Sequence, residues 1–304
     1  MKKLLLSVMA FVGVVSMNAQ IADVESVTPL LKGVESEMHN PVLSADGSQL
    51  LFSECDYTGL RLYDFNDNVV VKVSTEARAG LDASFSPDGK EIYFVTQTLQ
   101  NNRNMRQVKK YDIASRQTIE VSKQGRVISR PVATTKGFAT TVDGDLLVTD
   151  NKATRVRTEG TSLIIAKNGV EKAYTPVANS AGYIWSSLSP EGNKVMFFAA
   201  GFGIVITDLN GNILSTPGNF EAPVWYGNDH IVAMNATNDG HNYRSSQIVL
   251  LSADGSQYQA LTKPESMTMN PTASFDAGKI VYATIDGRLY QMNIKLKLDR
   301  RLKI

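Results

Sequence analysis

Cysteine is nearly absent from this chain of 304 residues, in which Cys55 is the only one. A single thiol excludes an internal disulfide, so packing and hydrogen bonding alone must hold the fold together. Cys55 lies between Glu54 and Asp56. Because a reactive thiolate needs a cationic neighbourhood, we interpret this cysteine as incidental.

Histidine is also scarce, and the three that occur are His39, His230 and His241. They form no H-E-x-x-H pair or other close ligand spacing, so no metal site is predicted. The chain has no G-x-S-x-G elbow, and only ten residues follow Ile294, which leaves no segment for a hydrolase triad. These absences predict a protein that is not an enzyme and that needs no cofactor.

Long apolar runs are confined to the amino terminus. Lys2 and Lys3 precede an uncharged apolar stretch, Leu4–Val15, and residues 16–20 are short and more polar. This stretch is too short to span a bilayer. The pattern is typical of a secretory signal peptide over residues 1–20. No cysteine follows the stretch directly, so a lipoprotein anchor is not expected. We predict a periplasmic or secreted protein without membrane insertion.

Neither sign of charge is in excess. Removing residues 1–20 takes two lysines from the 31 basic residues and leaves 29 against 30 acidic ones. Nucleic-acid and anionic-membrane partners require a basic surplus, so neither is expected. The locally basic end, Lys295–Ile304, is better explained as a solvated tail or edge strand.

What the chain does contain is a repeat. Glycines of tight turns recur at spacings of 42, 55, 48, 35 and 51 residues, each after a short mixed run and before a dense apolar one. Asp-Gly pairs favour two-residue hairpins, because glycine adopts positive φ without penalty. The turns are Asp46-Gly47, Asp88-Gly89, Asp143-Gly144, Glu191-Gly192, Tyr226-Gly227 and Ala277-Gly278.

Each turn is followed by signals for a third and a fourth strand, as in GLRLYDF and VVVKVS of the first repeat. Four short antiparallel strands in about 35–55 residues predict one blade of a β-propeller. A β-sandwich also alternates strands and turns, but it does not repeat a four-strand unit six times. We therefore predict an all-β, six-bladed β-propeller, with four antiparallel strands per blade, over residues 21–304.

The sixth repeat lacks its own fourth strand. Residues near Ile21–Val27 supply the missing signal, because Val24–Gly47 and Gln257–Gly278 follow the same pattern up to an Asn-Pro pair and a turn. We expect the amino-terminal strand to complete the last blade and close the ring. Leu298–Ile304 is the alternative closing strand.

The segment Phe85–Gln97, FSPDGKEIYFVTQ, resembles the repeat of TolB-type propellers, which are also described as WD-like repeats. Asn40–Ser53 and Ser186–Ala199 are similar to it, whereas the third and fifth repeats depart from the pattern. The same repeat occurs in periplasmic scaffolds that bind envelope proteins and in the amino-terminal propellers of dipeptidyl-peptidase-like proteins. The resemblance implies a propeller, and it does not carry a function with it.

In a propeller, the loops before the first strands and between the second and third strands emerge on one face, which usually binds partners. Six residues are predicted to open the first strands, and two long polar loops, 97–106 and 236–246, are predicted to lie beside them. The opening residues are Asn40, Asp82, Gly137, Trp185, Ala222 and Asn270. The binding candidates are Asn40, Asp82, Trp185 and Asn270, with Arg103, Asp239, His241 and Tyr243 from the loops.

The sequence therefore predicts an exported, monomeric binding or scaffold propeller that recognises a cell-envelope protein or glycan. A propeller lyase or hydrolase acting on polysaccharide is the enzymatic alternative, and it would use His230 and Asp82. An accessory propeller of a separately encoded peptidase is a third possibility.

Overall fold

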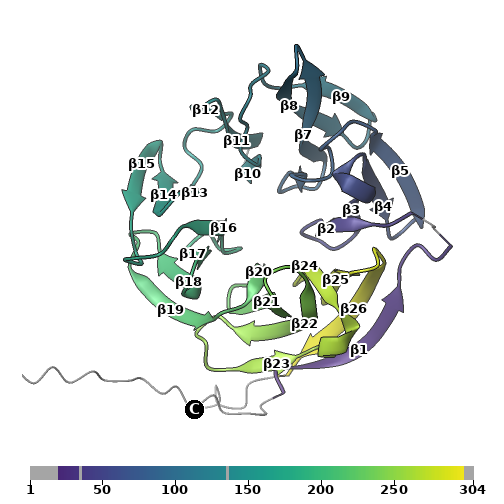
Figure 1. The fold of residues 1–304 in the computed structure, drawn as a ribbon, viewed down its shortest axis with the longest axis vertical. Coiled ribbons are helices and arrows are strands. Elements are labelled where there is room, and N and C mark those ends of the chain that lie inside the picture. Colours follow the sequence, from purple (N-terminus) through teal and green to yellow (C-terminus); the bar gives the residue numbers. More distant parts are fainter. Residues whose placement is uncertain (1–19, 34–35, 135–136, 298–304) are drawn as a thin grey trace, which may run out of the picture.

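The fold is given by a computed structural model that describes residues 20–33, 36–134 and 137–297. Small antiparallel sheets stand around a common axis, and the chain passes through them in order (Figure 1). The predicted signal peptide lies outside the described residues, apart from Gln20, and so does the alternative closing strand, Leu298–Ile304. The all-β propeller predicted from the repeat is confirmed.

Five of the predicted blades are four-stranded sheets. Their strands are β2 (His39–Leu43), β3 (Gln49–Ser53), β4 (Leu60–Asp64) and β5 (Val69–Ser74); β6 (Ser84–Phe85), β7 (Glu91–Gln100), β8 (Arg103–Asp112) and β9 (Gln117–Glu120); β16 (Tyr183–Leu188), β17 (Lys194–Ala199), β18 (Gly203–Asp208) and β19 (Ile213–Gly218); β20 (Glu221–Tyr226), β21 (His230–Asn238), β22 (Tyr243–Ser252) and β23 (Tyr258–Ala260); and β24 (Thr268–Ser274), β25 (Lys279–Thr284), β26 (Leu289–Leu296) and β1 (Ala22–Pro29).

The third predicted blade is assembled differently, because its residues are divided over two consecutive three-stranded sheets. One sheet contains β10 (Val132–Thr134), β11 (Gly137–Val142) and β12 (Asp145–Val148), and the next contains β13 (Arg155–Glu159), β14 (Ser162–Lys167) and β15 (Val170–Tyr174). The described ring thus holds seven hydrogen-bonded sheets where the repeat counts six units. The repeat missed one sheet because β10 is three residues long and meets β11 without an Asp-Gly turn.

Ring closure follows the prediction. Strand β1 pairs antiparallel with β26, from Ala22 opposite Leu296 to Pro29 opposite Tyr290. Ala22 is fully buried and Ile21 nearly so, against β22, β25 and β26. The last sheet also contacts the first one directly, because the Leu43 N–H donates to the Thr272 hydroxyl at 3.0 Å. Side chains and a terminal strand therefore close the ring without a covalent bond.

Serine and aspartate side chains stabilise the Asp-Gly turns predicted from the repeat. The Ser44 hydroxyl donates to Asp46 Oδ1 at 2.6 Å and accepts from the Gln49 N–H at 2.9 Å, so one serine connects both sides of the turn. Ser86 makes the same pair of bonds with Asp88 and with the Glu91 N–H. The Ser-x-Asp-Gly pattern therefore stabilises the hairpin by hydrogen bonds, and its aspartate carboxylates are hydrogen-bonded within the turn.

The hydrophobic core consists of layers between neighbouring sheets. Of the seven sheet-to-sheet junctions, six contain a cluster of buried apolar side chains, for example Leu51, Phe85 and Phe94 between the first two sheets. Among the described residues, the junction between the two three-stranded sheets has no such cluster. In the described part of the chain, helical structure is limited to two short 3-10 turns, η1 (Cys55–Tyr57) and η2 (Pro264–Ser266). No helix in residues 20–33, 36–134 and 137–297 is long and apolar enough to cross a bilayer.

Candidate ligand-binding site

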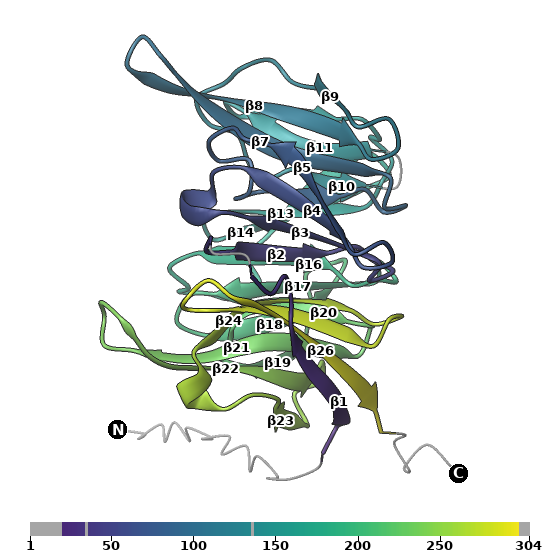
Figure 2. The ribbon, with the colours of Figure 1, turned by 90° about the vertical axis from the view of Figure 1, so that its right-hand side faces the viewer.

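Two long hairpins project from the same face of the ring (Figure 2). One joins β7 to β8 and the other joins β21 to β22, and strands of nine or ten residues carry both tips beyond the neighbouring sheets. The innermost strands β2, β16 and β24 also begin on this side, because the first residue of each pairs with the last residue of the second strand, as His39 does with Ser53. We call this side the mouth face.

The innermost strands share a one-residue bulge close to their start. In β2, His39 pairs with Ser53 and Val42 with Leu51, so the inner strand has one residue more than its partner. Strands β16, β20 and β24 have the same irregularity. The residue after the last regular pair has positive φ in all four strands, a conformation of a few per cent of non-glycine residues. These residues are Asn40 (φ 51°), Trp185 (55°), Ala222 (46°) and Asn270 (49°).

Arg130 occupies the corresponding place in the sheet of β10 to β12. Ile128 forms a bridge with Val142 and Val132 pairs with Ala139, so the first strand again has one extra residue. This corrects the prediction for Gly137, which begins the second strand of its sheet and does not open the first. The sequence contains a signal that could have found Arg130. Arg130 precedes a proline, as Asn40, Ala222 and Asn270 also do.

A cavity of about 240 Å³ lies between the two three-stranded sheets, at the junction that has no buried apolar cluster. We call it the junction pocket. Three consecutive sheets of the ring contribute to it, with Arg130 from the first, Arg155 and Arg157 from β13, and Trp185 from β16. The rest of the wall is half apolar, from Val132, Ala139, Leu146 and Val156, and half hydroxyl-bearing, from Ser129, Thr140, Thr158 and Ser186. Trp185 is 42% exposed and meets the ring of Phe198 edge-on, 5.4 Å between centroids.

Two arginines of the pocket share one carboxylate oxygen. Arg155 Nη2 lies 2.9 Å and Arg157 Nη1 2.7 Å from Glu171 Oε1, and Arg157 Nε donates to Glu159 at 3.0 Å. Burial opposes the ionisation of Glu171, but the hydrogen bonds and charges of Arg157 and Arg155 outweigh it, and the pKa of Glu171 lies below its usual value. The carboxylate is therefore ionised and holds both guanidinium groups at the wall of the pocket.

Arg155 has unused hydrogen-bonding capacity. Arg155 is only 4% exposed, and its Nε–H is buried without an acceptor in the described structure. A buried donor without a partner typically costs about 1–3 kcal/mol. An unsatisfied buried donor in a native protein requires an explanation, and a bound water or ion is one of those known.

Arg130 makes no hydrogen bond or ion pair with any described residue. Its side chain is accessible to solvent but is surrounded by protein, and this desolvation lowers the pKa of the guanidinium, while the charge of Asp82 acts in the opposite direction. Asp82 itself is bonded to Arg78, at 2.6 Å. Arg130 therefore adds a positive charge to the pocket wall that no neighbour fully neutralises.

Two of the other predicted strand-opening residues, Asn40 and Asp82, have hydrogen-bonding partners. The side-chain amide of Asn40 donates to the carbonyl oxygens of Gly80 and Leu81, both at 2.8 Å, and so connects the first two sheets. Asp82 is engaged by Arg78. Asn270 is half-buried, and its side chain makes no hydrogen bond within the described part of the chain. Only Trp185, among the predicted candidates, lines the junction pocket.

The remaining candidates lie at the two hairpin tips. Arg103 begins β8 and is exposed. Asp239 accepts hydrogen bonds from the backbone N–H groups of Asn242 and His241, which lower its pKa, and it is ion-paired with Arg244. Desolvation and the nearby Glu221 raise the pKa of Tyr243, whose hydroxyl lies 3.1 Å from Glu221. The structure places these residues on the mouth face but away from the pocket, and their binding role stays a prediction.

The residues of the enzymatic alternative are not brought together. His230 begins the second strand of its sheet, next to the turn that follows β20, whereas Asp82 precedes an innermost strand. The two residues therefore lie at opposite ends of their blades. Desolvation lowers the pKa of His230, with Asp229 opposing it. Within the described ranges, no three His, Cys, Asp or Glu side chains are grouped so that they could hold a metal ion.

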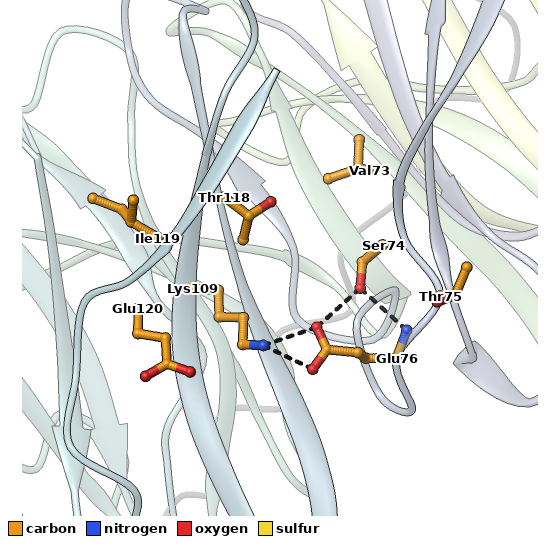
Figure 3. A pocket seen from close by; sticks show the side chains of 8 residues that line it. All are labelled: Val73, Ser74, Thr75, Glu76, Lys109, Thr118, Ile119 and Glu120. Carbon is orange, nitrogen blue, oxygen red and sulfur yellow. Dashed lines mark hydrogen bonds and ion pairs between the residues drawn. The ribbon is translucent and has the colours of Figure 1, made fainter. Parts of the chain in front are cut away.

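A second depression lies on the outer side of the ring, between β5 and the pair β8–β9 (Figure 3). It measures about 340 Å³ and is open. Lys109 Nζ lies 2.7 and 3.0 Å from the two carboxylate oxygens of Glu76, so the cation in this groove is already neutralised (Figure 3). Its remaining charge is the carboxylate of Glu120. We therefore consider the junction pocket the better candidate for a binding site.

Comparison with known proteins gives a fold and no family. No protein-family description matches the chain, and no curated protein does. The WD40 repeats of RRP9 superpose with a TM-score of 0.61 at 10% identity, covering 91% of this chain and 99% of that one. A chain of the Mitotic Checkpoint Complex gives 0.58 at 10%, covering 96% and 98%.

TolB from Acinetobacter baumannii gives a TM-score of 0.48 at 18% identity, covering 73% of this chain. The protein described here spans about half, 53%, of that TolB chain. At 10% identity, the similarities to RRP9 and to the Mitotic Checkpoint Complex chain establish the β-propeller fold alone. The propeller class implied by the TolB-type repeat is thereby confirmed.

Proposed function

We propose that this protein is an exported, non-enzymatic binding module that recognises a protein or glycan of the cell envelope, in the periplasm or outside the cell. The proposed surface is the mouth face, formed by the two hairpins and the starts of the innermost strands.

The observation that supports this proposal is the shared position of both hairpins on one face of a rigid ring (Figure 2). Loops on a rigid scaffold are the usual carriers of recognition. The hairpin tips expose polar and aromatic groups, among them Arg103 and Tyr243. Arg, Tyr and Trp are the residue types that contribute most to protein interfaces.

The proposal is tested by affinity capture from an envelope extract of the source organism, with the mature protein as bait. Arg103→Glu reverses a charge on the mouth face. Lys90→Glu makes the same kind of change in the same sheet, but at the turn between β6 and β7, on the opposite face of the ring. We expect the first variant to lose a captured partner and the second to keep it. Equal capture by both variants, or no specific capture, would contradict the proposal.

The non-enzymatic part of the proposal is tested separately. The purified protein is incubated with uronic-acid oligomers and divalent metal ions, and products and thermal stability are measured. We expect neither turnover nor a metal-dependent stabilisation. Turnover that is lost in Asp82→Ala would identify an enzyme instead, and capture of a peptidase in the first experiment would favour an accessory role.

A further inference from the structure

We propose that the junction pocket binds the carboxyl terminus of a peptide, with the terminal carboxylate at Arg130 and Arg155 and the last, apolar side chain against the wall beside Trp185. This inference rests on the proposed function and narrows the partner to a protein with an apolar last residue.

The size of the pocket limits what it can hold. Pockets for drug-sized ligands measure about 300–1,000 Å³, and the junction pocket, at about 240 Å³, is smaller. It therefore accommodates a single anchor residue of a larger partner. Its walls come from three sheets, and Arg130 and Trp185 lie near the mouth-face starts of their strands, where the rest of a peptide can continue.

The chemistry of the wall requires a ligand that is both anionic and apolar. Arg130 has no hydrogen-bonding partner among the described residues, and the Arg155 Nε–H has no acceptor. Directly beside them, Val132, Leu146 and Val156 present apolar surface. A carboxylate accepts several N–H bonds in one plane, which matches the geometry of guanidinium donors.

The charges near the pocket leave an unmatched cation. Arg155 and Arg157 share Glu171, Arg157 also contacts Glu159, and Arg130 interacts with an Asp82 that is already bonded to Arg78. Four guanidinium groups thus face three carboxylates. One carboxylate from a ligand would balance this set.

Other carboxylates fit less well. A uronic sugar places its carboxylate on a ring covered with hydroxyl groups, and the apolar part of the wall, Val132, Leu146 and Val156, would leave those facing it without hydrogen bonds. An internal Asp or Glu brings the carboxylate but no apolar group beside it. The last residue of a peptide combines a carboxylate and an apolar side chain on one carbon atom, and recognition of a terminal carboxylate is an established mode of peptide binding.

The fluorescence of Trp185 provides a direct readout. The chain has two tryptophans, so Trp225→Phe leaves Trp185 as the only one. This variant is titrated with acetyl-Gly-Ala-Leu carrying a free carboxylate, with the same peptide as its amide, with acetyl-Gly-Ala-Glu amide and with galacturonic acid. We expect a saturable change for the free carboxylate and at least a tenfold weaker response for the other three probes.

Two pairs of variants locate the binding. Arg130→Gln should weaken the peptide at least tenfold, whereas Arg126→Gln, an exposed arginine outside the pocket, should leave its affinity unchanged. Leu146→Asp places a negative charge in the pocket and should abolish binding. Leu99→Asp makes the same change on the tip of the β7–β8 hairpin and should have no effect. Leu146 and Leu99 are 40% and 70% exposed, so both variants can fold, which thermal unfolding verifies.

The result also separates this inference from the proposed function. If Arg130→Gln and Leu146→Asp still capture the envelope partner as the wild type does, the pocket inference is wrong and the mouth-face proposal stands. Equal binding of the free and amidated peptides would also overturn the inference, and so would preferential binding of galacturonic acid. Loss of both peptide and partner in the two variants supports it.

Discussion

Gln259 and Ile21 are 238 residues apart in the chain, and the side-chain oxygen of Gln259 accepts a hydrogen bond of 2.6 Å from the backbone N–H of Ile21. The same oxygen accepts from the Ala22 N–H at 2.8 Å, and the Gln259 amide donates to the Ala22 carbonyl at 2.9 Å. One side chain of the penultimate sheet thus holds the start of the closing strand in register.

Gln259→Ala should therefore weaken ring closure. It leaves two partly buried N–H groups and one carbonyl without partners, and we expect a loss of about 1–3 kcal/mol in the free energy of unfolding. Gln257→Ala, two residues earlier, removes a side chain with no hydrogen bond in the described structure and should change little. Denaturant titration of both variants measures the difference, and equal stability would show that Gln259 does not hold the strand.

Asn40 and Asn270 provide a matched comparison, because both occupy the bulge of an innermost strand with similar positive φ. The Asn40 amide bonds two carbonyl groups of the next sheet, whereas the Asn270 side chain has no such bond among the described residues. The cost of placing alanine at positive φ is common to both substitutions. We expect Asn40→Ala to lose about 1–3 kcal/mol more than Asn270→Ala in thermal unfolding.

If the two asparagines instead contribute mainly to binding, both variants should keep their stability and lose the captured partner. This outcome would restore Asn40 as a contact residue and remove the structural role assigned to it here.

The turn aspartates predict a dependence of stability on pH. The Ser44 hydroxyl lowers the pKa of Asp46, and the Ser86 hydroxyl lowers that of Asp88. A pKa that is lower in the folded state stabilises the protein above the unfolded value of about 3.9, and this contribution is lost as the pH falls through the folded pKa. We expect the melting temperature to fall with acidification below about pH 4.

The serine variants supply the control for this effect. Ser44→Ala and Ser86→Ala remove the hydroxyl donors, so the combined variant should be less stable at neutral pH and should lose less further stability on acidification. Melting curves between neutral and strongly acidic pH, measured at constant ionic strength, test this. Parallel curves for the wild type and the variant would show that other groups cause the acid dependence.

Gly80 lies where the entry to the second sheet meets the first. A Cβ atom there would be 2.0 Å from the Cβ of Ser53 and 2.7 Å from the carbonyl oxygen of Gly59. Gly182 also precedes an innermost strand, but its nearest neighbour would be the Gly160 carbonyl at 3.6 Å. We expect Gly80→Ala to destabilise by at least about 2 kcal/mol and Gly182→Ala to be nearly neutral. Comparable melting temperatures for the two variants would contradict this packing argument.

The fold was largely predictable from local chemistry. Asp46-Gly47 and Asp88-Gly89 form hairpin turns through local hydrogen bonds and backbone preferences. Each turn can therefore be recognised in the sequence without knowledge of tertiary contacts. The last repeat lacks its own fourth strand, and the amino-terminal strand, residues 22–29, fills that place. The count of sheets failed at Gly137, because the short strand β10 has no turn signal and is recognisable only by its pairing with β11.

The sequence by itself determined the repeating turns, the alternating apolar strands and, through both, a ring of small sheets closed by its own amino-terminal strand. Only the tertiary structure decided where the junction pocket lies and which positively charged side chains line it. Arg130, Arg155 and Trp185 come from three different sheets, and nothing local in the chain marks them as neighbours. The packing of whole sheets around the axis leaves the junction between the two three-stranded sheets without an apolar core and turns these three side chains into one wall.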